Sequence, residues 1–270
     1  MPKLDLTRAI RIKGAGGEIA ALKTPGFEWV RPVSDPILAY FQSTGAYGLY
    51  YTPWDKGALY QDAAGTIPVV NSLDPAALML DISGNANHAS TDVSTRRPQW
   101  IDNHLKFDGT DDLLEVPLNL SHTNTITVIS LWRRSTRTDL RHLLEFTENS
   151  FSTNGAFLIR SSVSGSNTAG SRMRRSSAIT HDFSVMNNTI AAVTLYNKSP
   201  TNMTSRVDGA EVQESTIPDM VFANDVLYIG GRGNTQYSFA GELYALAIID
   251  HTLPHNLLVE FEQHFGGLAV

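Results

Sequence analysis

The stretch LKFDGTDDLLEV, residues 105–116, decides the fold of this chain of 270 residues. Its Asp-Gly step lies between two short, partly apolar runs. This pattern is typical of a tight turn between two strands, because glycine adopts positive φ at little cost. We therefore expect residues 105–107 to pair with residues 112–116 as a hairpin. In this interpretation Asp108 binds its own turn backbone and Phe107 points into the core.

Three aspartates in the same stretch suggest an alternative to a plain turn. Asp108, Asp111 and Asp112 lie within five positions, which invites a metal site or a catalytic carboxylate pair. A second turn, LDISGNANHAS, places Asp81 and Asn85 around a glycine, where they turn the chain or supply oxygens to a cation. Calcium takes about six to eight oxygen ligands, so either set needs further donors. Calcium is therefore the cofactor to consider.

Short strands bounded by Gly, Asn, Asp or Ser dominate the chain. Residues 124–134, NTITVISLWRR, have apolar residues in both alternating sets, which predicts a strand buried on both faces. The Asp208-Gly209 step of RVDGAEV predicts a hairpin. Helical spacing of apolar residues is clear only over 254–265, before a glycine pair at Gly266. The pattern as a whole predicts an all-β sandwich with a short C-terminal helix.

The composition argues against several classes of protein. A net charge of −6 does not favour binding to nucleic acid or to an anionic membrane. The chain has no cysteine, which excludes disulfides and thiolate metal sites. No apolar run approaches the roughly 18 residues of a membrane span, and the first residues lack the apolar core of a signal peptide. We therefore expect a protein made in the cytoplasm, without membrane insertion.

The first 35 residues differ from the rest and are rich in glycine and proline. We expect residues 1–35 to form a small N-terminal element of about two strands, followed by one main domain over 36–270. The segment PGFEWVRPVSDP is predicted to be the hinge between them. Two strands cannot bury a core alone, so this element should pack on the main domain or on another subunit.

Signatures of catalysis are scarce in the sequence. The Gly-x-Ser-x-Gly elbow, the His-Glu-x-x-His motif and the phosphate-binding loop are all missing. A glycosidase needs two carboxylates about 5–10 Å apart. Closely spaced glutamates occur in three pairs: Glu145 with Glu148, Glu211 with Glu214, and Glu260 with Glu262. The first two pairs would point to opposite faces of a strand and the third lies on the predicted helix, so we expect no enzymatic activity.

The motifs follow one order along the chain. LKFDGTDDLLEVP, NTITVISLWRR, SRVDGAEV and LYIGGRGNTQYSFAGELYALAIIDHTLPHNLLVEFEQHF together resemble the laminin-G-like, concanavalin A-like jelly roll. The resemblance covers about residues 45–265 and implies a jelly-roll β-sandwich. Pro254 replaces the serine that usually precedes the family's last helix. The Glu-x-Asp-x-x-Glu motif of the family's glucanases is absent, which argues against hydrolysis.

The segment upstream of the jelly roll adds a second resemblance. GLYYTPWDKGALYQDAAGTIPVV, LMLDISGNANHAS and RRPQW resemble a pattern common in structural proteins of phages and prophages. This implies a homo-oligomeric tail-fibre, spike or head-decoration subunit in the virion, anchored to other virion proteins or sister chains through residues 1–35. The jelly roll would then bind a host-surface glycan. A lectin module of a bacterial or prophage protein is the alternative, and a polysaccharide depolymerase is a third hypothesis.

A lectin site in such a domain would combine aromatic rings with polar side chains. Residues 160–177, in which Arg172, Arg174 and Arg175 are clustered, are predicted to be a solvated loop or a loop that contacts an anionic glycan or a partner. The candidate glycan-binding residues are Arg172, Arg174, Arg175, Trp54 and Tyr237. Further aromatic candidates are Tyr50, Tyr51 and Trp100. Each aromatic residue alternatively belongs to the core or to a subunit interface.

Overall fold

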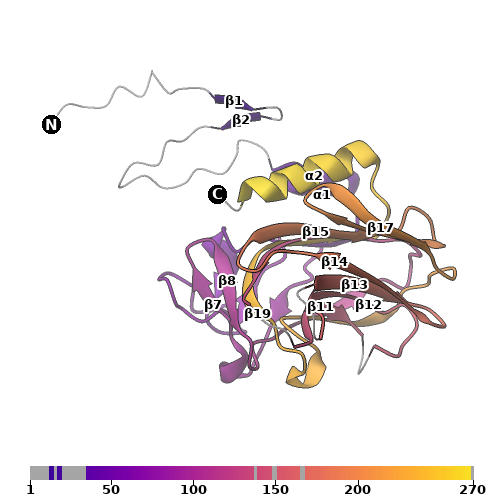
Figure 1. Ribbon diagram of the computed structural model, residues 1–270. Helices are drawn as coiled ribbons and strands as arrows, with labels where there is room; N and C mark the ends of the chain where they lie inside the picture. The colour runs from indigo at the N-terminus through magenta and orange to yellow at the C-terminus, as the bar shows by residue number, and fades with distance from the viewer. Residues whose placement is uncertain are drawn as a thin grey trace.

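The computed structural model of the chain describes residues 12–14, 17–19, 35–136, 139–147, 151–164 and 168–268. Within these residues two antiparallel β-sheets pack face to face, and two helices lie against the outer face of one sheet (Figure 1). The sandwich predicted from the sequence is therefore confirmed.

The sheet under the helices, called here the helix-covered sheet, has the strand order β17-β16-β15-β10-β19-β8-β7, and β3 pairs with β19. Its strands are β3 (Gly48–Tyr51), β7 (Gln99–Ile101), β8 (His104–Asp108), β10 (Thr127–Arg134), β15 (Ile190–Tyr196), β16 (Asn202–Val207), β17 (Ala210–Thr216) and β19 (Ala240–Ile249).

The other sheet, called here the open sheet, has the order β14-β13-β12-β11-β18-β9-β6-β5-β4. Its strands are β4 (Leu59–Tyr60), β5 (Leu78–Met79), β6 (Ala89–Ser90), β9 (Leu114–Asn119), β11 (Arg141–Phe146), β12 (Phe157–Ser162), β13 (Thr168–Arg174), β14 (Ala178–Ser184) and β18 (Asn224–Ile229). The described residues also contain three short 3-10 helices: η2 (Lys56–Ala58), η3 (Ser94–Arg96) and η4 (Gly233–Thr235).

Strand β10 shows why the helix-covered sheet is apolar on both faces. Val128 and Trp132 lie in the core between the two sheets, whereas Ile129 and Leu131 pack under the helices. Side chains alternate across a strand, so only a strand with two apolar sets can serve two cores. The prediction of a strand buried on both faces is confirmed.

Two helices form the second core on the outside of this sheet. The C-terminal helix α2 (His255–Leu268) matches the predicted helix but continues through the glycine pair that was expected to stop it. Helix α1 (Pro36–Thr44) was not predicted, although Asp35 caps its N-terminus and Gly45 ends it with φ 66°. An N-cap aspartate, a proline at the first helical position and a following glycine are the signals that could have found it. Neither helix is long and apolar enough to span a membrane.

A buried ion pair joins α2 to the helix-covered sheet. Arg206 on β16 donates from Nε to Glu262 Oε1 at 2.9 Å and from Nη2 to Glu262 Oε2 at 3.0 Å. The hydroxyl of Thr194 on β15 donates to Glu262 Oε1 at 2.8 Å. The Arg206 and Glu262 side chains are only 6% and 3% exposed. Glu262 is thus a structural residue of the helix interface.

The hairpin expected in the 105–116 stretch is not formed, and that prediction is wrong. Strand β8 pairs with β7 and β19 in the helix-covered sheet, whereas β9 pairs with β6 and β18 in the open sheet. The turn between them therefore passes from one sheet to the other. The Asp-Gly step fixes the local reversal of the chain, but it does not fix which strands become neighbours.

The local interpretation of the same turn is confirmed. Asp108 accepts a hydrogen bond from the Thr110 N–H at 2.7 Å, and Phe107 is buried in the core. Gly109 has φ 81°, and a Cβ there would lie 2.6 Å from Ala240 Cβ on β19. This position therefore needs glycine for its backbone conformation and for the close approach of the neighbouring strand.

Two other local predictions have opposite outcomes. Asp208 and Gly209, with φ 49° and 80°, join β16 to β17, so the predicted hairpin is confirmed. The predicted loop over residues 160–177 is instead mostly sheet, because it includes the end of β12 and all of β13. Its serines and glycines hid the alternation of side chains that marks a strand.

The N-terminal element contains two short strands, β1 (Ile12–Gly14) and β2 (Gly17–Ile19), which pair antiparallel as expected. The predicted hinge lies outside the described residues except for Asp35 and Pro36, which begin α1.

Candidate functional site: the outer face of the open sheet

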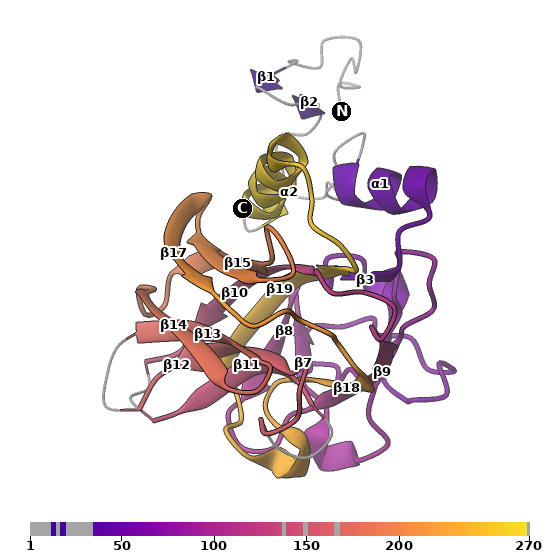
Figure 2. The ribbon, with the colours of Figure 1, turned by 90° about the vertical axis from the view of Figure 1, so that its right-hand side faces the viewer.

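Strands β11 to β14 present their outer face on the side of the sandwich away from α2 (Figure 2). Leu144 and Phe146 of β11 point inward to the core, and so do Phe157 and Ile159 of β12. Because side chains alternate along a strand, Glu145 and its cross-strand neighbours point outward.

Two cross-strand rows cross this outer face. In the first row Glu145 lies between Tyr228 and Leu158, and Leu158 lies opposite Arg172. In the second row the register runs His142, Arg160, Gly170, Asp182. Directly opposed residues on antiparallel strands share a face and interact. The topology thus gathers charged side chains from four separate strands.

Glu145 is the centre of the face and is fully buried. His142 Nδ1 lies 2.6 Å from Glu145 Oε2, and Arg232 Nε donates to both carboxylate oxygens at 3.0 Å. Tyr237 covers this group, with its ring 4.8 Å from the His142 ring and 4.7 Å from Arg232 Cζ. Burial lowers the pKa of His142 and outweighs the opposite effect of Glu145. The imidazole is therefore neutral at pH 7.

The second row contains an ion pair that is packed tightly against the strand between its partners. Arg160 forms an ion pair with Asp182, reaching over Gly170 on the strand between them. A Cβ on Gly170 would lie 2.7 Å from Arg160 Nη2 and 2.8 Å from Asp182 Oδ1. Glycine at this position therefore leaves room for the ion pair.

Arg172 and Arg174 extend the cationic part of the face along β13. The Arg172 guanidinium lies 4.7 Å above the ring of Phe151. Its Nε is buried and, within the described residues, has no hydrogen-bond partner. Arg174 donates from Nε to the Ser152 carbonyl at 3.0 Å. The face has a local charge of +2, although the whole chain carries −6. This local charge is the sum of four arginines, Arg160, Arg172, Arg174 and Arg232, and two carboxylates, Glu145 and Asp182.

The loop that places Tyr237 has an unusual backbone. Asn234, Thr235 and Tyr237 all have left-handed φ, at 73°, 56° and 56°. The loop is closed by the Arg232 N–H, which donates to the Gln236 carbonyl at 2.9 Å, and the Tyr237 carbonyl accepts from the backbone of β11. Such conformations cost free energy in non-glycine residues and cluster at functional sites. Here the strain fixes an aromatic ring over a charged group.

The structure brings together only part of the predicted glycan-binding set. Arg172, Arg174 and Tyr237 lie on this face, whereas Arg175 lies in the turn after β13. Trp54 precedes η2 and β4, at the opposite edge of the open sheet. The other aromatic candidates belong to the core: Tyr50, Tyr51 and Trp100.

Sequence reasoning missed His142, Arg160 and Arg232, and it considered Glu145 only with Glu148 as a catalytic pair, which it rejected. The only local signal was weak: Arg172 and Arg174 alternate along one strand and therefore share a face. The remaining residues come from strands and a loop far apart in the sequence.

The acidic stretch serves the turn between the sheets. Asp112 is buried and accepts from the Asp108 N–H at 2.7 Å. Burial raises the pKa of Asp112 from 3.8 to about 7, and the negative charges of Asp108 and Asp111 add to the increase.

The polar side chains of the second turn, Asp81 and Asn85, also bind mainly backbone groups. Asp81 accepts from the N–H groups of Tyr50, Ser83 and Asn87 and from the Ser83 hydroxyl, at 2.8 to 3.0 Å. Asn85 donates to the Ala46 carbonyl at 3.0 Å. In the part of the chain that the structure describes, no three His, Asp or Glu residues are placed to hold a metal ion. Calcium stays a prediction, to be tested by melting with calcium and with chelator.

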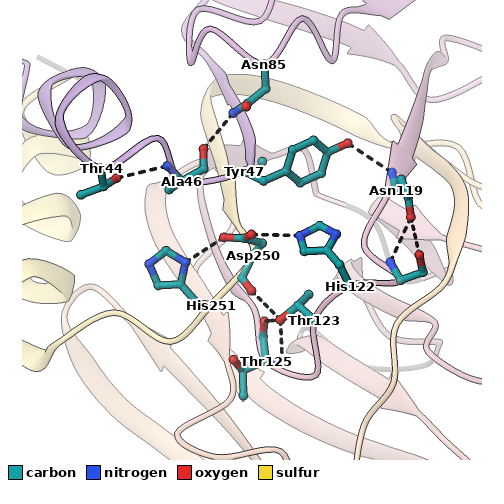
Figure 3. Close-up of polar contacts among 12 residues, drawn as sticks. Thr44, Ala46, Tyr47, Asn85, Asn119, His122, Thr123, Thr125, Asp250 and His251 are labelled. Carbon is teal, nitrogen blue, oxygen red and sulfur yellow. Dashed lines mark hydrogen bonds and ion pairs between the residues drawn. The ribbon is translucent and has the colours of Figure 1, made fainter.

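A second polar cluster surrounds Asp250 at the end of β19 (Figure 3). Its carboxylate bridges His122 Nε2 at 2.9 Å and His251 Nδ1 at 2.7 Å. His251 also lies 2.5 Å from the Tyr40 hydroxyl of α1. Burial opposes ionisation, but these two histidines lower the pKa of Asp250. The cluster ties the loop between β9 and β10 to β19 and α1, so we assign it a structural role.

Comparison with known proteins agrees with this architecture. Residues 108–256, more than half of the chain, match the family model of the Concanavalin A-like lectin/glucanases superfamily. The chain belongs to this superfamily. No curated protein matches the chain in sequence.

Solved structures show how widely this superfamily fold is shared. The chain superposes on a GH54 α-L-arabinofuranosidase with a TM-score of 0.64 and 8% identity, covering 87% of this chain and 65% of that one. For a Trypanosoma rangeli sialidase the TM-score is 0.59, the identity 12% and the coverage 83% and 33%. For the binding domain of Paraclostridial Mosquitocidal Protein 1 the values are 0.53, 15%, 70% and 49%. The chain spans at most 65% of these proteins, and at such identities they share its fold alone.

Proposed function

We propose that this chain is a non-enzymatic virion subunit whose jelly roll binds a glycan on the outer face of the open sheet. The observation that carries the glycan part is the group formed by Tyr237, Arg232, His142 and Glu145. Sugar sites combine an aromatic ring, which packs on the apolar face of a pyranose, with fixed polar groups that bind hydroxyls. On this face the half-buried ring of Tyr237 offers the aromatic surface, and the half-buried Arg232 offers polar donors. The buried Glu145 and His142 hold Arg232 and Tyr237 in position from below.

The energetics of this face favour a binding role over a stabilising one. A buried ion pair returns little stability, because taking both charges out of water costs about as much as their attraction gives. Glu145 and Arg232 are nevertheless placed on the outward side of the sheet, under a strained loop. A sequence that needed only stability would be better served by apolar residues there. The Arg206–Glu262 pair carries a similar cost, but it joins α2 to a sheet. Glu145 and Arg232 lie on an outer face that neither α1 nor α2 covers, and this position favours ligand recognition as the explanation.

The arrangement of the carboxylates supports binding without catalysis. A glycosidase needs one carboxylic acid to donate a proton and a second carboxylate on the other side of the bond. Both oxygens of Glu145 accept from Arg232, and Asp182 is paired with Arg160. Each carboxylate is thus held by a cation. We expect the purified chain to bind oligosaccharides without cleaving them, as measured by chromatography of the recovered sugar.

The glycan site is tested with variants of the full chain on a glycan array and by calorimetry. Asparagine tolerates left-handed φ, so Tyr237→Asn removes the ring while the backbone keeps its conformation. We expect at least tenfold weaker binding, equivalent to about 1.4 kcal/mol. The matched control is Tyr60→Asn, on β4 at the opposite edge of the sheet. Equal affinities of the two variants, or no binding to any host-envelope glycan, would refute the assignment.

The virion role rests on the resemblance of the segment upstream of the jelly roll to phage and prophage proteins. We propose that residues 1–35 attach the chain to other virion proteins and to sister chains, while the jelly roll projects outward without binding nucleic acid. Deleting residues 1–35 should abolish incorporation into particles, as seen by electron microscopy and gel analysis. The deleted chain should remain folded and monomeric. Normal incorporation of the deleted chain would refute the anchoring role.

A further inference from the structure

We infer that the glycan bound at this face is acidic, and that its sugar carboxylate is held by the guanidinium of Arg172. This inference rests on the glycan-binding function proposed above and names the class of glycan. The ligand would be an oligosaccharide that carries uronic or sialic acid residues.

Arg172 differs from the other arginines of the face in its partners. Arg160 is paired with Asp182, Arg232 with Glu145, and Arg174 binds a backbone carbonyl. Within the described residues, Arg172 has a contact with the Phe151 ring and no hydrogen bond or ion pair. The buried Nε of Arg160 also lacks a partner, but Arg160 is held by Asp182 through Nη2. Among these four arginines, and within the described residues, Arg172 is therefore the one that no carboxylate or carbonyl holds.

Arg172 lies on the same outer face as Glu145, over which Tyr237 is placed. It follows Glu145 and Leu158 in the first cross-strand row, and Phe151 holds its guanidinium in place. The charge of Glu145 raises the pKa of Arg172 and the charge of Arg232 lowers it. Arg172 therefore lies close enough to the group under Tyr237 to interact with its charges. A sugar ring on Tyr237 could thus present a substituent to Arg172.

The chemistry of guanidinium selects a carboxylate as that substituent. The buried Nε of Arg172 has lost water without gaining an acceptor, which costs free energy. A planar carboxylate can accept from the two terminal nitrogens of this half-buried side chain in two parallel hydrogen bonds. The hydroxyls of a neutral sugar offer weaker, uncharged acceptors. The local charge of +2 derived above further favours an anion in a chain that is acidic overall.

The test compares one oligosaccharide in two forms, with its carboxylates intact and with the same groups reduced to alcohols. Calorimetry on the full wild-type chain is expected to show at least thirtyfold weaker binding of the reduced form. Arg172→Gln should lose this discrimination and bind both forms alike. Arg172→Lys keeps the charge but cannot form two parallel hydrogen bonds. Its preference for the carboxylated form should therefore lie between those of the wild type and Arg172→Gln. The control Lys106→Gln removes an exposed cation from the helix-covered sheet and should behave as wild type.

The outcomes separate the two proposals. Equal binding of both forms by the wild-type chain would overturn the inference and leave the glycan-binding function intact. Tighter binding of a sulfated analogue than of the carboxylated form would overturn the choice of a carboxylate. A folded chain that binds no glycan would overturn both proposals. Because the first comparison varies the ligand, it stands even if an Arg172 variant fails to fold.

Discussion

Replacing Glu262 with leucine is expected to destabilise the chain strongly, because it leaves the guanidinium of Arg206 buried without its carboxylate. Arg206 donates twice to Glu262, and Thr194 donates once, at 2.8 to 3.0 Å. Removing one partner of such a buried pair costs about 3–5 kcal/mol. The double variant Arg206→Met/Glu262→Leu should lose less than Glu262→Leu alone, because no buried charge then remains unpaired.

Equilibrium unfolding in urea measures these costs. With an m value of roughly 2–3 kcal/mol/M for a domain of this size, the loss in Glu262→Leu moves the midpoint down by about 1–2.5 M. The m value should stay constant if only the native state is affected. A matched control is Glu260→Leu on the same helix. The single variant Arg206→Met completes the comparison. If Glu262→Leu and Arg206→Met each lower the free energy of unfolding by under about 1 kcal/mol, and these losses add in the double variant, the two side chains are not coupled and the reasoning fails.

Three further predictions concern turns and the candidate site. Asp112→Asn should remove a pH dependence: with its pKa raised to about 7, the folded carboxyl keeps a proton that the unfolded chain releases. Wild-type stability should therefore fall from about pH 4 to pH 7 relative to the variant, and parallel pH curves of unfolding free energy would contradict this. Asp81→Asn should lower the free energy of unfolding by about 1–3 kcal/mol, as measured by thermal unfolding. The amide NH₂ of asparagine would replace one carboxylate oxygen that now accepts from several N–H and O–H donors. Gly170→Ala should cost about 1–3 kcal/mol by overpacking against Arg160, and an unchanged melting temperature would show that the strand moves freely.

The local signals in the sequence predicted local structure well. The Asp208-Gly209 step gave the β16–β17 hairpin, because a two-residue turn with both residues in the left-handed region needs only those residues. Residues 124–134 have apolar side chains in both alternating sets, which correctly predicted a strand buried on both faces. This prediction also depends only on the residues of the strand itself. The family and its β-sandwich follow from the order of such motifs.

Predictions that depended on distant partners fared worse. The 105–116 turn was correctly located, yet its flanking strands entered different sheets. Helix α1 was missed because its apolar stripe is short and is completed only by α2 and the helix-covered sheet. A helix of this length derives most of its stability from packing, so its own sequence carries a weak signal.

The sequence by itself determined the class of fold, the C-terminal helix and several turns, because these depend on spacing and on backbone preference over a few residues. The tertiary structure alone decided the sheet partners of β8 and β9 and the composition of the candidate site. His142, Glu145, Arg172 and Arg232 meet because antiparallel register brings separate strands and one strained loop together. Such register is set by contacts over the whole core, which no short stretch of sequence encodes.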